Sequence, residues 1–283
     1  MCELGFGIII TLVMCAFLCE YMDSTLGMGY GTTLTPVFLV MGFSPMEIVP
    51  AVLLSELITG LLAGIFHHCE GNVNFKPETA DVFKITNMLN PQGYIETFRR
   101  TVPLHLKVVL LLGTCSIVGT IVAVFIAVSI PEFWLKLYIG CLVLAMGIII
   151  LCCVNKKFKF SWKKIGFLGL IASFNKGMSG GGYGPVVTGG QILSGIEGKS
   201  AVGITSLSEG LTCLVGVAAY ALIAKNPVDW KLAPYIIIGA VLSVPLSAKS
   251  IKWISTKKLK IAIAILAMFL GLFTSIRTVA LKI

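Results

Sequence analysis

The sequence NKGMSGGGYGP at residues 175–185 decides how this chain can fold. It gathers five glycines, a serine and a tyrosine between a lysine and a proline, and apolar segments lie on both sides of it. A continuous membrane helix does not contain such a run, because glycine weakens a helix and permits the backbone angles of a break. The stretch therefore predicts a broken helix within an apolar segment.

A second glycine-rich stretch, GMGYG at residues 27–31, lies 153 positions earlier. At this constant offset nine residues of the first half recur in the second half without a gap. They are Gly27, Gly29, Tyr30, Gly31, Thr35, Gly42, Leu54, Ser55 and Glu56, matched by Gly180, Gly182, Tyr183, Gly184, Thr188, Gly195, Leu207, Ser208 and Glu209. An internal repeat with interrupted segments at corresponding positions indicates the binding site of a secondary transporter.

The composition excludes a soluble domain. The chain has 283 residues, of which 57% are hydrophobic and 12% charged, and its mean hydropathy is +0.95. A soluble domain carries about a quarter charged residues. We therefore expect an all-α polytopic protein of the lipid bilayer, with residues 1–283 forming one transmembrane domain, because no polar block is long enough to fold alone.

The net charge of +9 does not indicate a nucleic-acid partner. The basic residues lie in short loops between apolar segments, which is how membrane topology is encoded. The nine cysteines have no metal-type spacing, so we expect neither a metal site nor a cofactor.

The apolar segments form two sets of five. We expect them at residues 5–18, 34–42, 44–68, 103–130 and 133–154, and then at 165–174, 185–193, 198–224, 234–248 and 259–278. The polar stretch 69–101 contains a predicted interfacial amphipathic helix around residues 82–89. His67 and His68 end the third segment, where solvated interface residues are expected.

Lysine-rich loops orient the two halves. We interpret residues 155–164 and 249–260 as cytoplasmic, since such loops carry an excess of Lys and Arg. The halves are then inverted repeats, with repeat 1 at residues 1–154, a basic cytoplasmic linker at 155–164 and repeat 2 at 165–283. Both termini are predicted outside, in a multi-pass protein of the cell membrane, the plasma membrane of a prokaryote. The assembly state is left open, with a homodimer as one option.

The breaks predict an anion site. A helix restarts after each break, at Gly31 and at Gly184, and presents unpaired N–H groups with the positive end of its dipole. Inverted repeats would bring these two ends together, and Lys176 would add a full positive charge. The residues expected to bind the small anionic substrate are Gly29, Tyr30, Gly31, Thr32, Thr33, Thr35, Asn175, Lys176, Ser179, Gly180, Gly181, Gly182, Tyr183, Gly184, Thr188 and Gln191.

Three acidic residues are candidates for coupling or gating. Glu56 and Glu209 lie at equivalent positions inside apolar segments, where a carboxylate is costly and usually functional. They are expected to couple transport to protons or to gate the site by pairing with Lys176. Asp23 stands at the position equivalent to Lys176. Two alternatives stay open: glycines that serve close helix packing, and carboxyl groups that serve only packing.

The sequence resembles the TauE/SafE sulfite exporter family. The resemblance rests on the paired glycine-rich stretches, on SGGGYGP at residues 179–185 and on Leu207-Ser208-Glu209, and it extends over essentially the whole chain. It implies a polytopic carrier for sulfite, sulfonates or related sulfur oxyanions.

The predicted function is therefore secondary active transport of a small, sulfur-containing anion by alternating access at a midplane site. An anion-selective channel built from the same parts is the alternative. An intramembrane enzyme is disfavoured, because no histidine lies at a useful spacing from a carboxylate in the core segments; we expect no catalytic residue.

Overall fold

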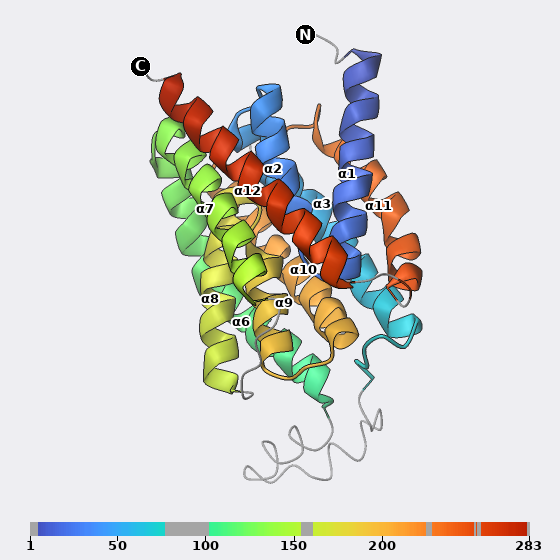
Figure 1. The fold of residues 1–283 in the computed structure, drawn as a ribbon. Coiled ribbons are helices and arrows are strands. Elements are labelled where there is room, and N and C mark those ends of the chain that lie inside the picture. Colours follow the sequence, from blue (N-terminus) through green and yellow to red (C-terminus); the bar gives the residue numbers. More distant parts are fainter. Residues whose placement is uncertain are drawn as a thin grey trace.

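A computed structural model describes residues 5–76, 102–153, 161–224, 228–251, 253 and 256–281 (Figure 1). Within these ranges the chain forms ten α-helices and no strand, which confirms the all-α class. With the labels of Figure 1, the helices of the first half are α1 (Phe6–Leu26), α2 (Tyr30–Met41), α3 (Pro45–Cys69), α6 (Leu104–Ser129) and α7 (Glu132–Cys153). Those of the second half are α8 (Trp162–Ser179), α9 (Tyr183–Leu193), α10 (Gly198–Ile223), α11 (Ala233–Ser250) and α12 (Thr256–Ala280).

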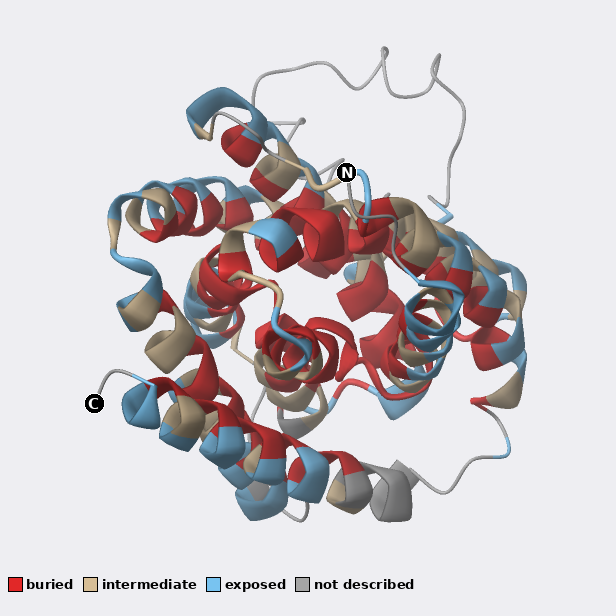
Figure 2. Ribbon diagram, turned by 90° about the horizontal axis from the view of Figure 1, so that it is seen from above, coloured by how far each residue is buried: buried red, intermediate tan, exposed pale blue. Residues whose placement is uncertain are grey.

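Seven of the described helices are long and apolar enough to cross a membrane. They are α1, α3, α6, α7, α10, α11 and α12. Figure 2 shows buried residues on the inner faces of the helices and exposed residues on the outer faces. The outer residues include large apolar side chains such as Phe125 and Phe269, which are 63% and 64% exposed. This is the arrangement of a multi-pass membrane protein, with apolar side chains toward lipid and polar groups inside.

The two breaks have the same backbone design. Gly27 caps the C-terminal end of α1 and Gly180 caps that of α8, with φ angles of 68° and 69°. The next helices begin after Gly29 and Gly182, whose φ angles are also positive. These left-handed conformations strain any residue with a Cβ, so glycine at these positions ends one helix and permits the next. The repeat predicted from the sequence therefore recurs in the backbone.

The helices before the breaks are longer than predicted. α1 continues past residue 18 and contains Glu20 and Asp23, and α8 continues past residue 174 and contains Lys176. In an apolar surrounding a helix satisfies its own backbone hydrogen bonds, so the chain stays helical until glycine permits a turn. Each break shrinks to three residues, and the charged side chains project from helical turns.

Equivalent helices of the two halves have equivalent partners. α1 packs on α11 as α8 packs on α6, α3 packs on α10, and α7 packs on α12. In Figure 1 the pair α1–α2 enters from the end where both termini lie, and the pair α8–α9 enters from the opposite end. This is the arrangement that an inverted repeat would give, although the inversion itself and the outside location of the termini stay predictions.

One expectation about the histidines is wrong. His67 is fully buried rather than solvated. Its Nε2 hydrogen-bonds with the backbone oxygen of Ser24 at 2.9 Å, and its Nδ1 accepts from Asn72 at 3.0 Å. The side chain ties the end of α3 to the end of α1. The predicted interfacial helix at 82–89 and most of the basic linker lie outside the described residues.

The contact between the breaks predicts an unequal response to two alanine substitutions. A Cβ on Gly31 would meet the carbonyl oxygen of Gly180, whereas a Cβ on Gly189 would meet nothing within 4 Å. We expect Gly31→Ala to destabilise the protein by about 1–3 kcal/mol, the usual cost of overpacking. Gly189→Ala, within helix α9, should be neutral or slightly stabilising. Thermal unfolding of the two purified variants in detergent checks this; equal melting temperatures would contradict the packing.

Candidate functional site

The two breaks lie directly against each other. Gly31 is packed on the carbonyl of Gly180, and Gly184 is packed on the carbonyl of Gly27, with no room for a Cβ on either glycine. Two hydrogen bonds cross the contact. Thr188 Oγ1 donates to the Gly27 oxygen at 2.6 Å, and the Gly182 N–H donates to Thr32 Oγ1 at 3.0 Å. Glycine packing and the candidate site are therefore features of the same place, and one does not exclude the other.

Lys176 occupies the centre of the protein. Its side chain is completely buried, on the last full turn of α8. The ammonium pairs with Glu56 of α3 and with Glu209 of α10, the latter at 2.7 Å. A buried ammonium is tolerated only with charged or hydrogen-bonding partners. The two glutamates at equivalent positions thus hold one lysine between them.

The pairing depends on the close approach of α3 and α10. A Cβ on Gly60 of α3 would lie 2.9 Å from the Cα of Gly210 and 2.7 Å from the carbonyl oxygen of Ser206. Because both helices are narrow at this level, their backbones come together and the two glutamates reach the same point.

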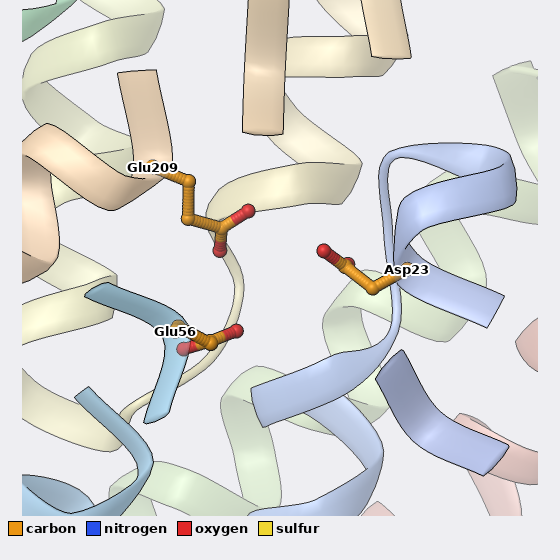
Figure 3. Close-up of side chains that lie close together, drawn as sticks. All are labelled: Asp23, Glu56 and Glu209. Carbon is orange, nitrogen blue, oxygen red and sulfur yellow. The ribbon is translucent and has the colours of Figure 1, made fainter. Parts of the chain in front are cut away.

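Helix α1 adds two more carboxyl groups. Oxygens of Asp23, Glu56 and Glu209 lie within 4.8 Å of one another, and Figure 3 shows the three side chains directed toward a common centre. Glu20 lies one turn before Asp23 and accepts hydrogen bonds from Ser24 at 2.7 Å and Thr59 at 3.1 Å. We call Lys176, Glu20, Asp23, Glu56 and Glu209 the charged cluster. Its four acidic members line a cavity of about 10 Å³, the room of a single water molecule.

Glu20 was missed in the sequence. The sequence signal for Glu20 was its spacing of three residues from Asp23, since residues three apart lie on the same face of a helix. That signal was hidden by the expectation that the first helix ends at residue 18. Once α1 is extended to Leu26, Glu20 and Asp23 fall on one buried face.

Most of the polar groups predicted to bind substrate are engaged within the protein. Tyr30 shares a 2.7 Å hydrogen bond with Ser55, and its backbone N–H donates to Asp23 at 3.4 Å. Asn175 accepts from Tyr138 at 2.8 Å, and Gln191 donates to Thr205 at 3.1 Å. Ser179 Oγ donates to the carbonyl oxygen of Asn175 at 2.8 Å. Among the described residues predicted to bind substrate, Thr33, Thr35, Tyr183 and Gln191 each keep a buried side-chain oxygen without a hydrogen-bond partner.

The helix ends are therefore covered in this conformation. The Asp23 side chain accepts a hydrogen bond from the backbone N–H of Tyr30, at the start of α2. The Thr32 side chain accepts one from the backbone N–H of Gly182, just before α9. Lys176 is directed at carboxylates of its own chain. The role of the helix ends and of Lys176 in holding an anion stays a prediction, and it requires a second arrangement of these side chains.

The charge balance shows what the cluster can do chemically. It has four carboxyl groups and one ammonium, so full ionisation would leave an uncompensated negative charge away from water. Such burial is costly, and uptake of protons or of another cation reduces it. The carboxylate oxygens Glu56 Oε1 and Glu209 Oε2 have no hydrogen-bond partner among the described residues. A metal ion would have to compete with Lys176 for the same carboxylates.

Known proteins resemble the chain over most of its length. A family model described as Sulfite exporter TauE/SafE matches residues 89–274. The chain is 26% identical over 253 residues to the "Probable membrane transporter protein YtnM" of Bacillus subtilis (strain 168), a match that covers 85% of this chain and 73% of that protein. No solved structure matches the chain. The family model covers Lys176 and Glu209 but not the first break or Glu56, so the wider extent of the resemblance rests on the Bacillus relative.

Proposed function

Because the chain belongs to the sulfite exporter TauE/SafE family, we propose that it carries a small sulfur-containing oxyanion across the cell membrane by alternating access. A membrane transporter role follows from the family and from the seven apolar helices. The identity of the anion, the alternating mechanism and the coupling are the proposal. The observation that carries it is Lys176, fully buried between two glutamates that come from equivalent positions of the two halves.

The position of the lysine supports an exchange of partners. Lys176 lies on α8 four residues before the break at Gly180, which leads into α9. An oxyanion in the breaks would be a better partner for Lys176 than a protonated glutamate. Protonation of Glu56 and Glu209 would free the ammonium, and deprotonation would recapture it. Anion binding and proton uptake then favour the same arrangement, which is thermodynamic coupling.

Helices α1, α3, α8 and α10 would carry this exchange. α3 and α10 provide the glutamates, α8 the lysine, and α1 the additional carboxyl groups of Glu20 and Asp23. Each of these helices, or the break that follows it, contacts its counterpart from the other half. A movement of one half against the other would therefore change the distances within the charged cluster, as alternating access requires.

Transport by Lys176 variants tests the proposed site directly. In proteoliposomes we expect uptake or efflux of labelled sulfite, sulfoacetate or thiosulfate, and Lys176→Ala should reduce it at least about 100-fold, because the variant has no counter-ion for the anion. Lys249→Ala, at the exposed end of α11, is the matched control and should transport normally. Undiminished transport by Lys176→Ala would show that the anion binds elsewhere.

A counterflow assay in the same vesicles distinguishes a carrier from an anion channel. A carrier loaded with unlabelled anion accumulates the labelled anion by counterflow, whereas a channel does not. Counterflow is the expected result; a large current without counterflow would favour the channel.

Another prediction concerns the coupling of transport to protons. Glu209→Gln keeps the size of the side chain but cannot exchange a proton near neutral pH. We expect it to retain counterflow while losing most of the accumulation driven by a pH gradient. Glu197→Gln, at the exposed N-cap of α10, is the control. If Glu209→Gln accumulated anion normally in response to a pH gradient, Glu209 would not be a coupling residue.

A further inference from the structure

A second cavity lies far from the charged cluster along helix α2. It has a volume of about 470 Å³ and is lined by the C-terminal ends of α2 and α12 and the N-terminal end of α7. Ligand sites typically have about 300–1,000 Å³. The end of α12 lies at the same end of the molecule as both termini (Figure 1). The cavity is therefore large enough for a small organic molecule and lies at the end of the protein where the two termini are found.

Arg277 provides the cavity with a positive charge. One nitrogen of its guanidinium donates to the carbonyl oxygen of Val40 at 2.5 Å. No carboxylate of the described residues forms an ion pair with it. A guanidinium has five N–H donors arranged as a fork that matches oxyanions. The bond to Val40 uses one donor and fixes the side chain beside the cavity, which leaves the others for a ligand.

Thr274 provides a second, independent sign of a ligand. It lies one turn before Arg277 on α12 and also lines the cavity. Its side-chain oxygen is buried and has no hydrogen-bond partner in the described part of the chain, and the residue is only 4% exposed. A buried hydroxyl without a partner is costly. A ligand oxygen in the cavity would satisfy it.

The other charges of the cavity cancel. Lys136 pairs with Glu132 one turn away on α7, at 2.7 Å, so Arg277 gives the lining a net positive charge. Phe133, Leu39 and Leu281 contribute apolar surface. The chemistry fits an oxyanion that carries a short apolar part, such as a small organic sulfonate.

We propose that this cavity is a second anion-binding site, a vestibule in which Arg277 and Thr274 hold the oxyanion before it passes to the breaks. The vestibule rests on the proposed function, since it takes the same anion. Helix α2 begins at the first break and ends at the vestibule. Its 12 residues put the two sites about 18 Å apart along the helix.

If Arg277 had only a structural role, different experimental results would be expected. As a cap for the last carbonyls of α2, Arg277 would affect melting temperature but not anion affinity. It would also leave the Thr274 hydroxyl unexplained. Affinity for an anion is therefore the decisive measurement, and Thr274→Val is a useful second variant because it removes the hydroxyl at nearly constant volume.

The test is calorimetric titration of the full-length protein with sulfoacetate, in nanodiscs of phosphatidylcholine. We expect Lys176→Met, which disables the central site, to keep one sulfoacetate site. Adding Arg277→Gln should weaken that site at least about tenfold, the loss expected for a charge-assisted hydrogen bond. Adding Thr274→Val should weaken it about threefold or more, and adding Lys249→Gln should not change it. No binding to Lys176→Met, or equal affinity with and without Arg277, overturns the vestibule.

A transport assay covers the case in which Lys176→Met does not fold. Arg277→Gln alone should raise the KM for sulfoacetate about tenfold and leave the maximal rate nearly unchanged, with Arg277→Lys intermediate because it keeps the charge but not the fork. An unchanged KM in a protein that transports sulfoacetate overturns the vestibule alone. Absence of transport of any oxyanion by the wild type overturns the proposed function instead.

A lipid headgroup shares the chemistry of an oxyanion with an apolar part. The titration is therefore repeated in nanodiscs that contain phosphatidylglycerol. We expect the affinity for sulfoacetate to be the same. Its loss in the anionic lipid would identify a headgroup phosphate as the occupant and overturn the assignment of a free anion.

Discussion

The lysine ammonium of residue 176 is completely buried, and its charge must be balanced by the protein. Glu56 and Glu209 balance it, and the close approach of α3 and α10 at Gly60 and Gly210 brings the two glutamates to the same point. Breaking such a buried pair by removing one partner costs about 3–5 kcal/mol. The packing of the central helices and the state of the ion pair therefore depend on each other, which is what a conformational carrier needs.

The glycine breaks place this ion pair at the contact of the two halves. Gly31 and Gly184 allow the backbones of the breaks to touch, and side-chain hydroxyls of Thr32 and Thr188 satisfy groups of the opposite break. The chain is not helical between α1 and α2, nor between α8 and α9. The same glycines thus pack the halves together and create the polar interior, so packing and function are not competing explanations.

Much of the fold could be predicted from the sequence, because glycine runs and apolar lengths act locally. The repeat, the breaks and the pairing of Lys176 with Glu56 or Glu209 followed from residue type and spacing. The extension of α1 past Glu20 and the burial of His67 did not, since both depend on neighbours from distant segments. The covering of the helix ends by Asp23 and Thr32 also required three-dimensional information. Sequence indicates which groups meet, but not which partner each one has in a given state.

The central claim is that Lys176 changes partners from glutamate to anion. The most direct measurement is an experimental structure of the protein with bound sulfite or sulfoacetate at a pH that protonates the glutamates. The account predicts anion density at the breaks, within hydrogen-bond distance of the Lys176 ammonium, with Glu56 or Glu209 released. Anion density elsewhere, with Lys176 still held between both glutamates, would contradict it.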